Sequence, residues 1–277
     1  MDLRNLTTKQ LEKMKKHGEI LETLRDYKGS DRVVRVAEAL EFIKNLPIAE
    51  KIDIRLPLIN KDLDGFRCGE LVVVSGPTGM GKTTLLQSFT YDFAKQNIPC
   101  TWFSYEVGVR DLVSRFSINE IPTFTLPLET VESNFKWLRQ RVWESVAKYK
   151  TKVIFVDHLH YLLDMNYLAK VNTSLAIGML MRDLKKLAIE ADIVIFLVSH
   201  LAKTKIEAEP DLDDIRDSSF IGQESDIVLV VYRVKDSTGR YDKSWLKIAK
   251  NRRKGTIGRV PIILRDGKFY EESLQTL

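Results

Sequence analysis

The sequence predicts an α/β fold: a mainly parallel sheet with helices on both faces and antiparallel strands added at its C-terminal edge. Two patterns lead to this expectation. Between residues 71 and 198, short apolar runs of strand length alternate with longer segments of helical periodicity. Beyond Ser225, strand-like runs follow one another with only turns between them, which is typical of hairpins. With 277 residues, 44% of them hydrophobic, the chain can bury one substantial core.

The first 47 residues are expected to form a helical appendage ahead of one main domain at 48–277. A polar helix should cover 7–27 and break near Gly18, and a second helix should end before Pro47. The second helix carries apolar residues at the spacing of one face: Val33, Val36, Ala37, Leu40 and Ile43. That face could pack on the body of its own subunit or on a neighbouring copy of the chain, and the pattern favours neither.

The elements of the main domain follow from local patterns. The first group of strands is expected at 71–74, 100–104, 153–157 and 193–198. Helices are expected from Leu85 to Phe93, at 129–149 and at 174–190. The second group of strands, joined by hairpin turns, is expected at 227–232, 245–249, 259–264 and 268–270.

The segment after the first strand has the form G-x-x-x-x-G-K-[ST]. Its residues are Gly76, Pro77, Thr78, Gly79, Met80, Gly81, Lys82, Thr83 and Thr84. In such a P-loop, backbone N–H groups and the positive end of the next helix converge on phosphate oxygens, and a Cβ at the glycines would block the phosphates or the backbone conformation. Lys82 is expected to reach the β- and γ-phosphates, and the Thr83 hydroxyl to ligate Mg²⁺. The motif therefore predicts a site for ATP or another NTP.

Three more polar residues stand at the predicted carboxyl ends of strands, where open α/β sheets place their ligands. Asp157 ends a run of four apolar residues and is expected to hold Mg²⁺. Glu106 follows the second strand, where it could activate an attacking water, or could instead be an N-cap or a surface glutamate of the helix after Gly108. His200 ends the fourth strand and could donate to the γ-phosphate, although a histidine at a strand end is more often structural.

Composition narrows the class of protein. The net charge of +5 fits a polyanion partner without deciding for one. Cys68 and Cys100 have the spacing of neither a disulfide framework nor a thiolate metal site, which is usual in a reducing cytosol. We find no signal peptide and no apolar run of membrane-spanning length, so we expect a soluble cytoplasmic protein with no membrane partner. His158, His160 and His200 suggest a transition metal, but nothing completes the ligand set, and an Mg²⁺–nucleotide complex already explains Asp157.

Taken together, an ordered set of motifs resembles the RecA-like motor domain of replicative ring helicases of the DnaB and Twinkle type. The similarity runs from about residue 48 to the end of the chain. Besides the P-loop, the matching motifs are Phe103-Ser104-Tyr105-Glu106, Val153–Asp157 with His158-Leu159-His160, Ser199-His200-Leu201, Asp214–Asp226, and Ala249-Lys250-Asn251-Arg252 with Gly255 and Gly258.

This resemblance implies a role for each matching residue. In chain order, the roles are phosphate and Mg²⁺ binding for Lys82 and Thr83, the catalytic carboxylate for Glu106, the Walker B aspartate for Asp157 and the phosphate sensor for His200. Lys250 and Arg252 match a pair that a neighbouring subunit inserts into the site, with Arg252 as the arginine finger. His160 is a departure, because bacterial members carry a Gln there that is thought to link the nucleotide to DNA.

By the same resemblance, DNA-contacting loops are expected at 166–173 and 202–219. Arg216 is the best match for a DNA contact, and Lys170, Lys203 and Lys205 are added on charge. The second loop is acidic, which opposes phosphate binding unless these side chains face away or pair with a neighbour: Glu207, Glu209, Asp211, Asp213 and Asp214. Residues 1–47 resemble at most the linker helix that docks on the next subunit.

The favoured function is an Mg²⁺-dependent ATP hydrolase that assembles as a homo-oligomeric ring, by resemblance a hexamer, and moves along single-stranded DNA to unwind a duplex. A primase or a loader is the implied protein partner. Two alternatives stay open: a RecA/KaiC-like ATPase that uses ATP as an assembly switch on DNA or a protein partner without unwinding, and a helicase loader or accessory subunit that retains the motor fold. The run Lys250-Asn251-Arg252 before glycine turns favours the helicase, and the filled catalytic positions oppose the accessory subunit.

Overall fold

The computed structural model of the chain describes residues 8–29, 32–46, 50–117, 120–163, 172–200, 209–210, 212–214, 218–235 and 241–272. The chain divides into two compact units, Met1–Ile48 and Ala49–Leu277.

The first unit contains two helices, α1 over Thr8–Arg25 and α2 over Val36–Lys44. The predicted break near Gly18 is wrong, because α1 continues through this residue. A single glycine inside a helix costs only about 1 kcal/mol relative to alanine, which an 18-residue helix can absorb. None of the residues of α2 is buried, and its exposed apolar side chains are Val36, Leu40, Phe42 and Ile43.

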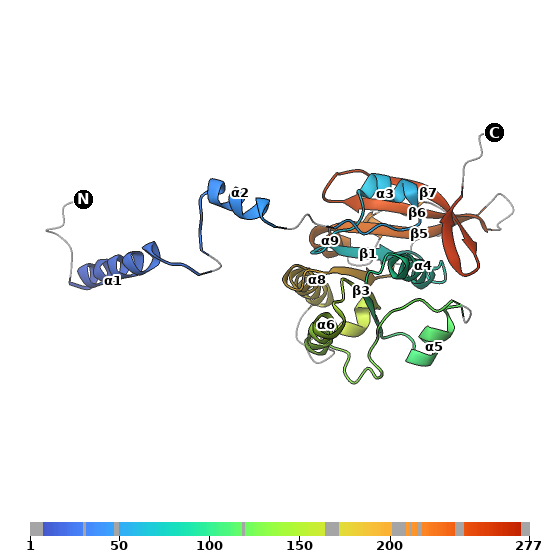
Figure 1. Ribbon diagram of the computed structural model, residues 1–277, viewed down its shortest axis with the longest axis horizontal. Helices are drawn as coiled ribbons and strands as arrows, with labels where there is room; N and C mark the ends of the chain where they lie inside the picture. Colours follow the sequence, from blue (N-terminus) through green and yellow to red (C-terminus); the bar gives the residue numbers. More distant parts are fainter. Residues whose placement is uncertain are drawn as a thin grey trace. The chain divides into compact units, whose positions relative to one another are not determined.

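The second unit is built on one eight-stranded sheet with the order β2-β3-β4-β1-β5-β6-β7-β8 (Figure 1). The strands are β1 Leu71–Ser75, β2 Cys100–Ser104, β3 Val153–Asp157, β4 Val194–Val198, β5 Ile227–Lys235, β6 Tyr241–Asn251, β7 Gly258–Arg265 and β8 Lys268–Glu271. Pairing is parallel from β2 through β5 and antiparallel from β5 through β8. This confirms the predicted mixture and its placement. β5 and β6 run past their predicted ends because they pair with each other over almost their full length.

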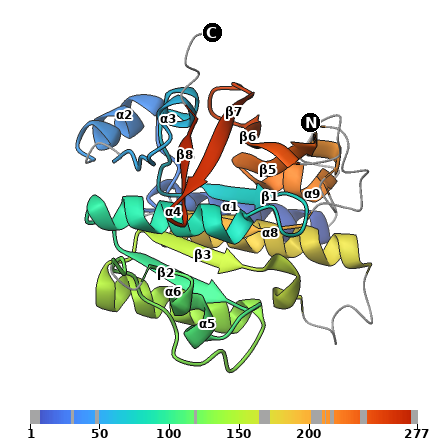
Figure 2. The same cartoon turned by 90° about the vertical axis from the view of Figure 1, so that its right-hand side faces the viewer.

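Helices cover both faces of this sheet, with α4 on one face and α8 on the other (Figure 2). The α-helices are α3 Pro57–Leu63, α4 Lys82–Lys95, α5 Val109–Ser114, α6 Phe135–Tyr149, α8 Thr173–Glu190 and α9 Ser218–Glu224, and two 3₁₀ turns are η2 Leu159–Leu162 and η3 Leu212–Asp214. Alternate residues of each strand face opposite layers. In β1, Val72 and Val74 pack in the layer of α3, α4 and α5, while Leu71 and Val73 pack in the layer of α6, α8 and α9.

One predicted helix begins later than its apolar pattern suggests. The pattern predicts helix α6 from Glu129, but the helix begins at Phe135. The side chain of Asn134 accepts a hydrogen bond from the backbone N–H of Trp137 at 2.9 Å, which is a helix N-cap. Val131, which the pattern assigns to the buried face, lies before this cap and is 74% exposed.

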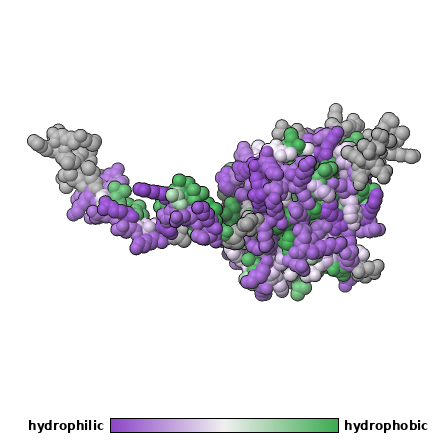
Figure 3. All heavy atoms as spheres, turned by 45° about the horizontal axis from the view of Figure 1, so that its top comes forward, coloured by the Kyte–Doolittle hydropathy of each residue, from purple (hydrophilic) through white to green (hydrophobic). Residues whose placement is uncertain are grey.

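The surface of the second unit is mostly polar on the face seen in Figure 3, where apolar residues gather only in small groups. Within the part of the chain that the structure describes, no helix is long and apolar enough to cross a membrane.

Candidate nucleotide-binding site

The predicted site residues follow parallel neighbouring strands, so they meet at one edge of the sheet. Ser104 of β2 pairs with Asp157 of β3, and Val74 of β1 pairs with Val198 of β4. The P-loop, Glu106, Asp157 and His200 therefore lie at or just beyond the carboxyl ends of four adjacent strands. This is the edge where open α/β sheets bind ligands.

Two of the P-loop glycines, Gly76 and Gly81, are required by packing as well as by backbone conformation. A Cβ on Gly76 would lie 2.1 Å from the backbone oxygen of Val231 in β5, which excludes any side chain. Gly81 is the N-cap of α4 with φ of 94°, and a Cβ there would lie 3.0 Å from the ring of Phe269. Strands β5 and β8 thus shape the loop that begins a 14-residue helix, whose N–H groups form an anion site.

Lys82 is buried, with its ammonium group turned into the P-loop. Its Nζ donates to the backbone oxygens of Gly76 at 2.9 Å and Pro77 at 3.1 Å. Burial lowers the pKa of Lys82, while the negative charges of Asp157 and Glu106 oppose that shift. The amine is thus held where a phosphate would offer it a stronger partner than two neutral carbonyls.

Thr83 and Asp157 meet directly, since the Thr83 hydroxyl donates to Asp157 Oδ2 at 2.9 Å. Asp157 is 1% exposed, and burial raises its pKa to about 6, with Glu106 adding a smaller repulsion. Its Oδ1 has no hydrogen-bond partner among the described residues. A buried carboxylate oxygen without a partner is costly, and this oxygen beside a threonine hydroxyl fits Mg²⁺ or a water bound to it.

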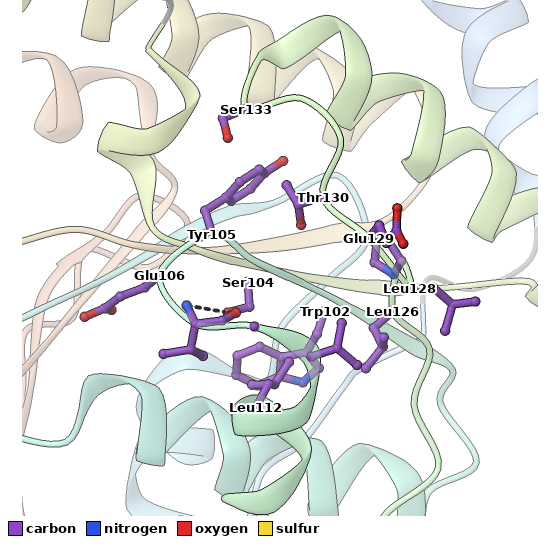
Figure 4. A pocket seen from close by; sticks show the side chains of 14 residues that line it. Trp102, Ser104, Tyr105, Glu106, Leu112, Leu126, Leu128, Glu129, Thr130 and Ser133 are labelled. Carbon is purple, nitrogen blue, oxygen red and sulfur yellow. Dashed lines mark hydrogen bonds between the residues drawn. The ribbon is translucent and has the colours of Figure 1, made fainter.

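Glu106 is fixed by the turn that follows β2. The Ser104 hydroxyl bonds both backbone groups of Val107, donating to its oxygen at 2.8 Å and accepting from its N–H at 3.3 Å. The Tyr105 N–H donates to the backbone oxygen of Asp157 at 2.6 Å, which joins this turn to the end of β3. The Glu106 side chain is exposed and lies at the margin of a cleft of about 430 Å³ that it helps to line, where it points away from Trp102 and Leu112 (Figure 4). The N-cap of α5 is Gly108, so the alternative role of Glu106 as the cap is not supported.

The three histidines form a compact ring cluster beside this site. The His158 and His200 ring centroids are 3.9 Å apart, and those of His158 and His160 are 5.5 Å apart. Burial and the two other imidazoles lower the pKa of His158 to about 3, so this ring is neutral at physiological pH. His200, the predicted sensor, therefore packs against an uncharged imidazole that follows strand β3.

Lys250 and Arg252 lie at the other end of the parallel strands, where β1 begins. The Arg252 N–H donates to the backbone oxygen of Asp226 at 2.8 Å, and the Asp226 N–H donates to that of Leu71 at 2.9 Å. Leu71 is the first residue of β1, whereas the P-loop follows the last, so this pair and the P-loop are at opposite ends of one strand. The Lys250 ammonium donates to the backbone oxygens of Gly222 and Ser225 in its own chain.

A comparison with known families matches the family described as "DnaB-like helicase C terminal domain" to residues 52–126 and 117–270. The chain belongs to this family. Relatives of the family include the replicative DNA helicase DnaB of Treponema pallidum, 29% identical in an alignment of length 227 that covers 72% of this chain and 50% of that protein. A probable replicative DNA helicase of Trieres chinensis is 25% identical in an alignment of length 244 that covers 73% of this chain and 53% of that protein. The chain spans about half the length of these relatives.

Several solved structures share the fold of this DnaB-type domain. One, described as an ATPase domain, has a TM-score of 0.71 at 18% identity, covering 86% of this chain and 97% of that one. A DnaB-like replicative helicase described with its interactions with primase also has a TM-score of 0.71 at 18% identity, covering 94% of this chain and 72% of that one. A KaiC-like protein of Pyrococcus horikoshii has a TM-score of 0.61 at 16% identity, covering 81% of this chain and 99% of that one. These likenesses establish the RecA-like fold.

The predicted DNA contacts of this DnaB-type domain, Arg216, Lys170, Lys203 and Lys205, lie outside the described residues. One acidic residue of the second loop shows its ion pairs. Glu209 forms them with Lys247 at 3.0 Å and with Arg259. The charge of Glu209 is therefore neutralised within the chain, and the DNA contacts of this loop stay a prediction.

Sequence reasoning gave no role to several polar groups, although Ser199 and Asp226 stand within the matching motifs. Ser75 and Ser199, adjacent at the ends of β1 and β4, are fully buried, and their hydroxyls have no hydrogen-bond partner among the described residues. Their position directly after apolar strands, like that of Asp157, was the available signal. Asp226 was also missed, and the residue before β5 carries no local pattern that would reveal its contacts with Leu71 and Lys185.

Proposed function

We propose that the chain is an ATP-hydrolysing motor domain of a replicative ring helicase, with each nucleotide site completed by a neighbouring subunit. The observation that carries this proposal is the placement of the two halves of the site. The residues proposed to bind phosphate and Mg²⁺ lie at the carboxyl end of β1, whereas Arg252 lies at its amino end.

The geometry argues against Arg252 acting on its own P-loop. From Leu71 to Ser75 the strand spans four residue steps of about 3.3 Å, or roughly 13 Å. The Arg252 guanidinium points to Asp226 at the amino edge, 3.8 Å away, and its side chain is 57% exposed. An exposed guanidinium on the side of the molecule remote from its own phosphate site is suited to the phosphate of the next copy.

At the carboxyl edge, each residue has a role that its surroundings support. Lys82 would exchange two loop carbonyls for phosphate oxygens, and Thr83 and Asp157 would hold Mg²⁺. ATP would supply the transferred phosphoryl group and Mg²⁺ would neutralise its developing charge. Exposed Glu106, held beside Asp157, would orient and deprotonate the attacking water, and His200 would sense the γ-phosphate.

The partners are proposed from the family. The relatives are named replicative DNA helicases, and one structural neighbour is described with primase, so single-stranded DNA and a primase or loader are the partners to test. The shared site requires an oligomer, and we propose a hexameric ring in the cytoplasm. The exposed apolar face of α2 supports docking of residues 1–47 on another copy.

The function is tested by measuring ATP hydrolysis and strand displacement together. The helicase proposal expects turnover that requires Mg²⁺, rises with single-stranded DNA and accompanies displacement of a labelled strand from a forked duplex. DNA-stimulated turnover without displacement, under conditions where assemblies form, would instead support an ATP-driven switch. Turnover that does not respond to DNA would contradict the helicase and a switch that acts on DNA.

A further inference from the structure

The carboxylate of Asp226 joins three elements at the amino edge of the sheet. Its Oδ2 accepts hydrogen bonds from the backbone N–H of Leu71 at 2.8 Å and from the ammonium of Lys185 in α8 at 2.6 Å. Its Oδ1 lies 3.8 Å from the guanidinium of Arg252. Asp226 is only 13% exposed, so this carboxylate is held in place rather than free in solvent.

Main-chain bonds connect the same two segments. The Arg252 N–H donates to the Asp226 oxygen, and the Lys250 ammonium donates to the oxygens of Ser225 and Gly222. Gly222 is in the last turn of α9 and Ser225 follows it, where a helix leaves carbonyl groups without intrahelical partners. A lysine there satisfies these carbonyls and opposes the negative end of the helix dipole. The turn that carries Arg252 is therefore held by Gly222, Ser225 and Asp226, which we call its seat.

This seat is tied to the strand that ends in the P-loop. Asp226 contacts the first residue of β1, and Lys185, its partner, also donates to the backbone oxygen of Gly69 at 2.7 Å. At the other end of β1, Ser75 leads into Gly76. One short, fully buried strand thus links a subunit's own phosphate site to the seat of the side chain that would serve its neighbour.

We propose that Asp226 is a positioning residue for Arg252, which sets the place of this guanidinium at the neighbouring subunit's nucleotide and links it to β1 of its own subunit. This inference rests on the proposed function, in which Arg252 acts on another copy. Asp226 cannot itself stabilise a phosphate, because its charge has the same sign. Lys250 shares the seat, but its positive charge could also act on phosphate, so a loss of activity in a Lys250 variant would not separate the two roles.

A purely structural carboxylate would behave differently from a positioning one. If Asp226 only joins β1 to α8 through Lys185, loss of the Asp226 carboxylate should weaken two sites equally. These are the nucleotide site of its own subunit and the neighbouring site to which this subunit contributes Arg252. If Asp226 sets Arg252, its loss should weaken only the neighbour's site. Direction within the assembly is therefore the decisive readout.

The test uses two mixtures that contain the same three substitutions. In the first, Lys82→Ala/Asp226→Asn subunits are mixed with Arg252→Ala subunits, so Asp226→Asn lies in the subunit that donates the finger. In the second, Lys82→Ala subunits are mixed with Arg252→Ala/Asp226→Asn subunits, so it lies in the subunit that donates the P-loop. Asparagine can still accept the Leu71 N–H bond but loses the charge that faces Lys185 and Arg252. DNA-stimulated hydrolysis is measured against the parent mixture, with native mass measurement of mixed assemblies.

We expect the first mixture to lose on the order of tenfold to a hundredfold relative to the parent mixture, since a misplacement of about 1 Å can cost that much in rate. The second mixture should stay within about twofold of its parent. Glu224→Gln is the matched control: Glu224 is a neighbouring carboxylate paired with Arg182 at 3.0 Å, and its replacement should leave both mixtures unchanged. Asp226→Glu serves if the asparagine variant does not assemble, because it retains the charge but displaces the carboxylate by one methylene, and the same one-sided loss is expected.

Equal losses in the two mixtures would overturn the inference and make Asp226 a general support of the fold. No loss in either mixture would also overturn it. These results differ from failure of the proposed function, which would appear as an inactive parent mixture despite demonstrated mixed assemblies, and which would remove the role of Asp226 along with the shared site.

Discussion

The two ends of strand β1 differ in how their buried polar groups are satisfied. At the carboxyl end, Asp157 Oδ1 and the hydroxyls of Ser75 and Ser199 have no hydrogen-bond partner among the described residues. At the amino end, the Asp226 carboxylate and the Lys250 ammonium are bound to neighbouring groups. Buried polar groups are normally paired, so the unpartnered oxygens give the first end the character of a ligand site. The bound Asp226 and Lys250 give the second end the character of a support, although Arg67 Nε and Arg253 Nε there also have no partner among the described residues.

The largest effect is expected at the carboxyl end. Lys82→Ala should abolish ATP turnover while the protein remains folded, because the point charge aimed at the β- and γ-phosphates is lost, whereas the bonds it breaks are only to loop carbonyls. Phosphate release and thermal unfolding measure the two quantities. Lys61→Ala, at an exposed position of α3, is the control. Near-normal hydrolysis in Lys82→Ala would show that the P-loop is not the site of ATP turnover.

Glu106→Gln should retain nucleotide binding and lose roughly 10²- to 10⁴-fold in turnover, since the amide preserves shape but cannot accept the proton. Equilibrium binding of a fluorescent ATP analogue and single-turnover hydrolysis separate the two effects. Glu129→Gln, in the lining of the same cleft, should be neutral. Loss of binding in the Glu106 variant would show that the turn after β2 is structural.

Asp157→Asn should raise the stability of the nucleotide-free protein while preventing Mg²⁺-dependent turnover. Burial raises the pKa of Asp157 to about 6 from 3.8, so the folded protein holds this proton over a range where the unfolded chain releases it. Stability is therefore lost as pH rises from about 4 through 6, by up to about 3 kcal/mol, and the loss persists at higher pH. Urea unfolding of the wild-type and Asp157→Asn proteins at pH 5 and 8 measures the gain in the free energy of unfolding. A larger gain for the variant at pH 5 than at pH 8 would contradict this sign.

A smaller effect is expected from the predicted DNA loop that precedes α9. Arg216→Ala should weaken single-stranded DNA binding and reduce the slope of log K against log salt by about one unit if this residue contacts a phosphate. Titrations by fluorescence anisotropy at several salt concentrations give the slope. A slope that does not change would place the DNA path elsewhere.

Features encoded by neighbouring residues were predictable from the sequence. The P-loop, the strand ending in Asp157 and the hairpins after Ser225 depend on short-range patterns, and the structure has them where expected. The start of α6 was missed because the Asn134 N-cap begins the helix at Phe135, although the apolar periodicity extends further toward the N-terminus. Asp226 was missed because its partner Leu71 lies 155 positions away, and only the fold brings them together.

A nucleotide site made by two subunits can be tested by mixing two variants that are each inactive. Arg252→Ala alone should bind ATP normally and lose about 10³-fold in turnover, and Lys82→Ala alone should be inactive. Mixed at several ratios, with native mass measurement of the assemblies, the two variants should recover DNA-stimulated hydrolysis, because some interfaces then combine an intact P-loop with an intact Arg252. Mixed assemblies that form at every ratio and recover no hydrolysis would contradict a site shared between subunits.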